Sequence, residues 1–114
     1  MKRCSENFLY GREVEKETVA EGMMRQILGY DDSLMMARVE FETGAIGYKH
    51  AHIHAQVTYV ESGKFEFTVG STSKVLEAGD CVYIPPDELH GAVCQEAGAL
   101  LDVFSPVRED FLGD

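Results

Sequence analysis

Two stretches alternate strictly between apolar and polar side chains, and this alternation limits the fold more than any other feature. In residues 64–69, KFEFTV, two phenylalanines and a valine share one face. In residues 34–41, LMMARVEF, every second residue from Met35 to Phe41 is apolar. Successive side chains of a strand point to opposite faces, so each stretch predicts a strand with one buried face.

Short segments of similar composition follow one another along most of the chain. The segments MRQIL, QVTYV, SKVLE, DCVYI, GAVCQ and ALLDVF predict further strands. The sequences between strands, DDS, TGAIG, ESGK, GSTS, EAGD, PPDE and QEAG, predict turns. No segment after residue 30 has helical periodicity with caps. We therefore expect an all-β sandwich or barrel over residues 19–114, preceded by a polar N-terminal arm over residues 1–18.

The charge and the cysteines exclude several classes of function. The chain has 20 acidic and 10 basic residues, a formal charge of −10, which disfavours nucleic acid and anionic membranes as partners. A small anionic substrate needs a local positive centre. Three scattered cysteines without a CxxC pair are typical of a reducing compartment. The start, MKRCSENFLYGREVEKE, lacks an apolar leader and no apolar run reaches membrane length, so we expect a cytoplasmic protein.

Three of the four histidines fall within five residues, HAHIH, at His50, His52 and His54. In an unbroken strand they would share one face with Gln56. The fourth, His90, follows the rigid segment IPPDEL. Such a run could be a solvated edge, but alternating imidazoles with an amide favour a metal site.

The spacing of these residues resembles the first cupin motif. Gly44 is followed after five residues by His50, after one by His52, after three by Gln56 and after six by Gly63. Glutamine stands where the family usually has glutamate.

The second cupin motif has a counterpart in Gly79, Pro85 and His90. Asp87 stands where the family usually has glycine, and aspartate tolerates left-handed turns. Cys94 replaces the family's asparagine. The resemblance implies a single-domain cupin, a double-stranded β-helix or jelly-roll barrel.

The motifs predict that one divalent metal is held by His50, His52, Gln56 and His90. Spacing alone leaves open the use of His52 with His54 instead. Cys94 either joins the site or is a small buried hydrophobe. Four neutral donors leave the ion its full charge, which suits a carboxylate or enolate oxygen. Nickel, zinc, manganese and iron all fit such donors.

The C-terminal segment LLDVFSPVRED offers further candidates. Asp102 and Phe104 share one face of a predicted strand. An acid opposite a metal is a candidate general acid or base, whereas an acid on an edge strand is merely solvated. Arg108 is either a carboxylate clamp or a solvated tail residue. Phe104 is either core or a platform for substrate.

Residues 23–112 resemble the KdgF family, cupins of pectin and alginate degradation. The resemblance lies in the segments DDSLMM, GAIGYKHAHIHAQVTYVESGKFEFTVG, AGDCVYIPPDELHG and LDVFSPVREDFL. It implies a metal-dependent enzyme of lyase or isomerase type that opens 4,5-unsaturated uronate monosaccharides to linear keto-uronates. Asp102, Phe104 and Arg108 would be its substrate-side residues. Ile53 and Ala55 depart from the family's HPHEQ pattern, a change expected to affect packing or subunit contacts, or the substrate range.

Two rival interpretations remain at this point. One is a cupin isomerase or dioxygenase acting on another small acid, and the other is a non-enzymatic cupin that binds metal or sugar. An open sheet edge or face also predicts a homodimer.

Overall fold

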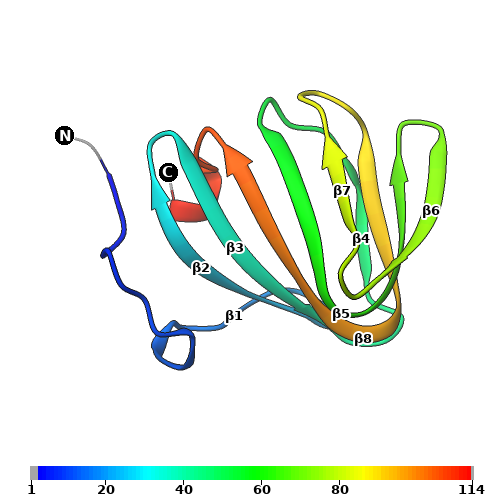
Figure 1. The fold of residues 1–114 in the computed structure, drawn as a ribbon, viewed down its shortest axis with the longest axis horizontal. Helices are drawn as coiled ribbons and strands as arrows, with labels where there is room; N and C mark the ends of the chain where they lie inside the picture. Colours follow the sequence, from blue (N-terminus) through cyan, green and yellow to red (C-terminus); the bar gives the residue numbers. More distant parts are fainter. Residues whose placement is uncertain (1–2, 114) are drawn as a thin grey trace.

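The computed structural model describes residues 3–113, which form one antiparallel β-barrel. Its strands are β1 (Glu17–Ala20), β2 (Met23–Asp31), β3 (Leu34–Phe41), β4 (Ile46–His50), β5 (Ala55–Val69), β6 (Thr72–Glu77), β7 (Cys81–Ile84) and β8 (His90–Ser105), with short 3-10 helices η1 (Gly11–Glu13) and η2 (Glu109–Leu112). The strand order is β1-β2-β3-β8-β5-β6, while β4 pairs with β8 and β7 with β5. In Figure 1, β5 and β8 bend at the base and run through both sides of the barrel. The predicted all-β, single-domain fold is confirmed.

The N-terminal lead-in is tied to the barrel by a buried side chain. The Gln26 amide, on β2, donates hydrogen bonds to the carbonyl oxygens of Gly11 (2.7 Å) and Val14 (3.0 Å). Strand β1 then begins at Glu17, just before the boundary predicted at residue 18. Residues 1–2 of the predicted arm and residue 114 of the predicted barrel domain lie outside the described residues, and the division itself stays a prediction. Across residues 3–113, no helix has the length and apolar character needed to cross a membrane.

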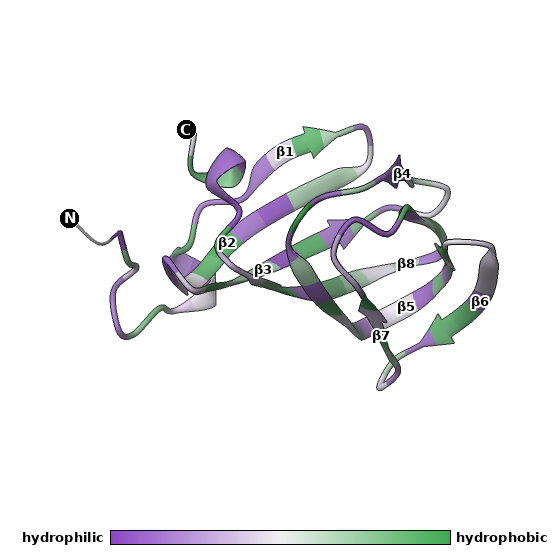
Figure 2. Cartoon of the chain, turned by 90° about the horizontal axis from the view of Figure 1, so that it is seen from above, coloured by the Kyte–Doolittle hydropathy of each residue, from purple (hydrophilic) through white to green (hydrophobic). Residues whose placement is uncertain are grey.

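The alternating stretches bury their apolar faces as predicted. In β3, Met35 and Ala37 are fully buried and Phe41 nearly so. In β5, Phe65 is fully buried and its ring meets that of Phe41 edge-on, with the ring centroids 5.2 Å apart. In Figure 2, hydrophobic and hydrophilic segments alternate along β2 and β3. Burial of these faces supplies the main driving force for closing the sheet.

Two predicted turns are wrong, because ESGK and QEAG lie inside strands. The ladder between β5 and β8 continues through both segments, with register shifts around Ser62 and Lys64. Glycines permit this close crossing: a Cβ on Gly98 would collide with the Ser62 carbonyl, and one on Gly63 would lie 2.6 Å from the Glu96 carbonyl oxygen. Glycine-marked bulges therefore bend two long strands where four short ones and two turns were expected.

Gly98 should tolerate no side chain. We expect Gly98→Ala to lower the free energy of unfolding by about 1–3 kcal/mol, because the added methyl group overpacks the crossing of β5 and β8. Denaturant unfolding followed by circular dichroism measures this. Gly11→Ala is the matched control, since a Cβ there meets nothing within 4 Å. Equal stability of the two variants would show that the crossing is not tightly packed.

Candidate metal centre

The HAHIH run does not form the single strand that shared parity suggested. Strand β4 ends at His50 and β5 begins at Ala55, so His52 and His54 lie in the connection. His50 faces His90 directly, as its register partner across the β4–β8 ladder. A break in the strand, rather than a common strand face, thus brings the first two histidines to the start of β8.

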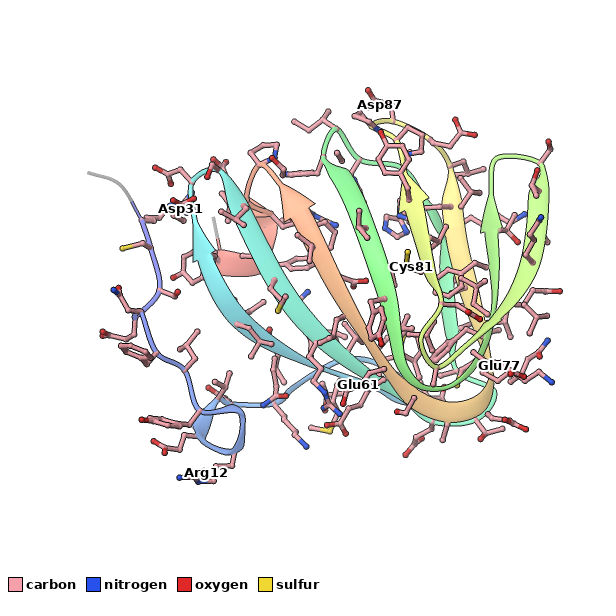
Figure 3. All side chains as sticks on the ribbon, in the orientation of Figure 1. Arg12, Asp31, Glu61, Glu77, Cys81 and Asp87 are labelled. Atoms are coloured by element: carbon pink, nitrogen blue, oxygen red, sulfur yellow. The ribbon has the colours of Figure 1, made fainter. Side chains whose placement is uncertain are left out.

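The second motif holds this connection in place. Asp87 adopts a left-handed conformation, with φ of 65°, and its N–H donates to the His52 carbonyl oxygen at 2.7 Å. Figure 3 shows Asp87 at the tip of the loop between β7 and β8. Aspartate therefore serves in the turn where glycine is usual, and it links the two motif segments.

His50, His52 and His90 form a three-histidine cluster. One ring nitrogen from each lies within 4.8 Å of the others, and the cluster could hold a metal ion. Each Nδ1 lies within hydrogen-bond distance of a backbone carbonyl oxygen, that of Tyr48 (3.0 Å), His54 (3.1 Å) or Glu88 (2.9 Å), respectively. A carbonyl only accepts, so in each neutral ring Nδ1 carries the proton and Nε2 keeps a free lone pair.

Two hydrogen-bond acceptors, the Gln56 amide oxygen Oε1 and Nε2 of His52, face each other at the edge of this cluster. The Gln56 amide nitrogen donates to the Thr58 hydroxyl (2.8 Å) and approaches Asp102 Oδ1 (3.4 Å), which turns Oε1 towards the histidines. That oxygen lies 2.9 Å from His52 Nε2. Buried His90 Nε2 has no hydrogen-bond partner within residues 3–113. Lone pairs that converge without a proton between them are stabilised by a cation. The ring nitrogens and the amide oxygen are therefore suitable ligand atoms for a divalent metal.

The surrounding protein favours the neutral form of two of these imidazoles, those of His52 and His90. Burial is the main cause that lowers the pKa of both His52 and His90 below the usual range of the side chain. Neutral imidazole is the form that binds metals. Three imidazoles and an amide add no negative charge, so a bound ion keeps its full charge.

His54 and Cys94 lie outside the cluster. The His54 Nε2 is 3.1 Å from the Val107 carbonyl oxygen, so its ring faces the C-terminal segment. The Cys94 thiol packs in the core with Phe65 and donates to the Glu96 carbonyl oxygen. Burial raises the pKa of Cys94, which disfavours a thiolate ligand. The His54 ring still lies beside that of His52, with the ring centroids 5.4 Å apart, but the ring nitrogens that cluster within 4.8 Å of one another are those of His50, His52 and His90.

Asp102 lies on the inner face of the barrel, next to the cluster. Its Oδ1 accepts a hydrogen bond of 2.6 Å from the Thr58 hydroxyl, across the β5–β8 ladder. The carboxylate borders the cavity but is surrounded by protein on its other sides. The resulting desolvation raises the pKa of Asp102, and the hydrogen bond from Thr58 opposes this by lowering the pKa. The interpretation as a merely solvated edge acid does not fit this position.

Phe104 and Arg108 complete one wall of the site. Phe104 is 2% exposed, and its ring meets His52 edge-on at 5.8 Å. The Arg108 side chain is 11% exposed, lies over the Phe104 ring at 5.0 Å, and is held by Asp110 through Nε and Nη2. Arg108 is therefore an ordered wall residue and not a solvated tail.

A single cavity of about 250 Å³ joins these groups. Its lining includes His50, Gln56, His90, Asp102, Phe104 and Arg108. Of the seven residues predicted as metal ligands or substrate contacts, all but His52 border it, and His52 contacts Gln56 and Phe104. The two alternatives, His54 and Cys94, do not line it. That His50, His52, Gln56 and His90 bind a metal and that the others act on substrate stays a prediction.

Two lining residues, Arg25 and Phe111, were missed by the sequence analysis. Arg25 is the register partner of buried Val39, so it is a charged residue on the inward face of β2. Strand parity within MRQIL could not have revealed it, because both faces of this strand carry apolar residues. Phe111 lies in η2, and no local pattern predicts its position against the barrel.

The barrel and its histidine cluster at one end are the features of a cupin. The Cupin domain family matches residues 37–104. The pectin degradation protein KdgF of Dickeya dadantii (strain 3937) is 43% identical over 98 residues, which cover 84% of this chain and 89% of that protein.

Two solved structures agree with this result. An RmlC-like cupin from Shewanella frigidimarina is 48% identical, with a TM-score of 0.93, over 95% of this chain and 97% of that one. KdgF from Halomonas sp. is 34% identical, with a TM-score of 0.90, over 94% of this chain and 99% of that one. The chain belongs to the cupin family and, within it, to the KdgF-like cupins.

The two candidate histidine pairs make opposite predictions about metal binding. We expect His50→Ala to remove most bound divalent metal, because it deletes a donor from the cluster, whereas His54→Ala retains it. Elemental analysis of the purified proteins gives the metal content per chain. Loss in His54→Ala with retention in His50→Ala would contradict the assignment and favour the pair His52 and His54.

Proposed function

We propose that this protein is a metal-dependent enzyme that opens the ring of 4,5-unsaturated uronate monosaccharides, released from pectin or alginate, to linear keto-uronates. The observation that carries the proposal is the convergence of the histidine cluster, Asp102 and Arg108 on one cavity. The KdgF-like relatives support the pathway, since the Dickeya protein is named for pectin degradation. A single monosaccharide matches the size of the cavity.

The metal would be held by His50, His52, Gln56 and His90. When bound, a divalent ion polarises substrate oxygens and stabilises negative charge that develops on them. The protein fixes the donors beforehand: backbone carbonyls orient the three imidazoles, and Thr58 orients the Gln56 amide. Nickel, zinc, manganese and iron remain the candidate ions.

Ring opening of such a sugar is an isomerisation that moves one proton. The anomeric hydroxyl loses its proton as the bond from carbon 1 to the ring oxygen breaks, which leaves an aldehyde and an enolate. Carbon 4 then gains a proton and carbon 5 becomes a ketone. Asp102 borders the cavity through a carboxylate fixed by Thr58, and it would accept the first proton and deliver the second.

The substrate's carboxylate and ring need separate contacts. Arg108 carries a planar guanidinium that matches a carboxylate, and Asp110 holds it from the solvent side. This provides the local positive charge that a chain of net charge −10 requires for an anionic substrate. Phe104 offers an apolar surface next to His52 on which the sugar ring can pack.

Asp102→Asn tests the proposed proton transfer. The amide keeps the shape of the side chain and can accept the Thr58 hydrogen bond, but it cannot take up a proton. We expect turnover of unsaturated galacturonate, followed by loss of its ultraviolet absorbance, to fall by about 10²–10⁴-fold. Bound metal per chain should stay unchanged in the same preparation. Wild-type activity in Asp102→Asn would remove Asp102 from the mechanism.

The rival cupin activities have distinct outcomes in the same preparations. Oxygen consumption by the iron-loaded protein with a small acid would indicate a dioxygenase. Tight sugar binding without turnover would indicate a binding protein. The predicted homodimer and the absence of nucleic-acid and membrane partners stay predictions.

A further inference from the structure

A second arginine, besides Arg108, lines the cavity. Arg25 comes from β2, its side chain is 15% exposed, and its guanidinium lies 3.8 Å from the centroid of the Phe111 ring. Arg108 lies 4.3 Å from the centroid of the same ring. Figure 1 shows η2, which carries Phe111, in red near β2 and β3. Two cations from distant parts of the chain therefore share one aromatic wall.

Each arginine is held from outside by a surface acid. Arg25 donates from Nε (3.0 Å) and Nη2 (2.9 Å) to Glu17, just as Arg108 donates from Nε and Nη2 to Asp110. Glu17 is 45% and Asp110 60% exposed, several times more than the arginines they hold. Within residues 3–113, neither Nη1 group has a hydrogen-bond partner. Both guanidinium groups thus keep an Nη1 group that is free to donate to a ligand, on side chains that border the cavity.

Such an arrangement is suited to binding an anion, even though each arginine is already paired with an acid. The acids face water, which screens their charge, whereas the arginines border a partly open cavity lined mainly by apolar side chains, where the effective dielectric is lower than in bulk water. Fixed N–H donors in such a place bind a carboxylate with little loss of side-chain entropy. A purely structural stack on Phe111 would not require Arg25 to border the cavity.

We propose that Arg25 is a second substrate-binding residue, which binds the carboxylate of the acid sugar together with Arg108, and that Glu17 positions it. The inference rests on the proposed function, since it names a further contact to the same class of substrate. Because Glu17 lies on β1, this strand, which is outside the cupin motifs, becomes part of the binding site.

Arg25→Gln should raise the KM for unsaturated galacturonate by about 10–100-fold, the loss expected for a charge-assisted hydrogen bond, with a smaller change in kcat. Arg38→Gln is the matched control. Arg38 lies on neighbouring β3 and is likewise held by an acid, Glu61, but it does not line the cavity. Its KM should stay within about twofold of wild type. Equal KM values for the two variants would overturn the inference.

Two further variants separate binding from folding. Arg25→Lys keeps the charge but loses the planar fork, and Glu17→Gln keeps Arg25 but loosens it, so each should raise KM less than Arg25→Gln while melting like wild type. If Arg25→Gln fails to fold, the KM values of Arg25→Lys and Glu17→Gln test the inference in its place. A wild-type KM in both variants would overturn it. In Arg25→Gln/Arg108→Gln, a combined loss smaller than the product of the single losses is expected for a shared carboxylate.

Calorimetry with unreactive sugars separates this inference from the proposed function. Holoprotein should bind saturated galacturonate more tightly than neutral galactose, and Arg25→Gln should reduce that preference about tenfold or more. If the wild type opens the ring but Arg25→Gln still prefers galacturonate over galactose as strongly as the wild type does, the role of Arg25 is overturned and the proposed function stands. A wild-type holoprotein that neither opens the unsaturated sugar nor binds galacturonate overturns both proposals.

Discussion

The pairing of β5 with β8 is the constraint on which the candidate site depends. Val69 lies opposite His90 at one end of this ladder, and Thr58 lies opposite Asp102 towards the other. Both strands bend at glycine-marked crossings instead of ending, so one continuous ladder runs through both sides of the barrel. Backbone hydrogen bonds therefore fix a histidine, an acid and the Gln56 amide relative to one another, although they are far apart in the sequence. The loop between β4 and β5 only has to add His52.

The polar groups of the cavity form a hydrogen-bond network around Thr58. Thr58 donates to Asp102 and accepts from Gln56, which leaves the amide oxygen of Gln56 facing His52. Backbone carbonyls orient the imidazoles of the cluster. The Nε2 atoms and the amide oxygen present convergent lone pairs, which favour a cation, and two guanidinium groups that border the same cavity favour an anion. The proposed substrate, an acid sugar, would satisfy both requirements by offering oxygens to a metal and a carboxylate to the arginines.

The sequence predicted what depends on local pattern and missed what depends on long-range packing. Alternation gave β3 correctly, because one face of that strand is buried. The bends in β5 and β8 were read as turns, since Gly63 marks a bulge as readily as a turn and only the partner strand decides between them. Motif spacing selected the histidines that cluster, whereas the separate expectation that they share one unbroken strand was wrong, because β4 ends at His50. Arg25 and Phe111 meet only through tertiary packing, so no motif connected them.

Proton nuclear magnetic resonance of unsaturated galacturonate, incubated with the wild-type holoprotein, tests the central claim most directly. The account predicts conversion to the linear keto-uronate much faster than in buffer, abolished by a chelator and restored by adding back a divalent metal. Conversion at the buffer rate by fully metal-loaded protein, with unsaturated mannuronate-derived sugar as well, would contradict it. The cupin fold would be unaffected by that result, and the site would have to catalyse a different reaction or only bind a ligand.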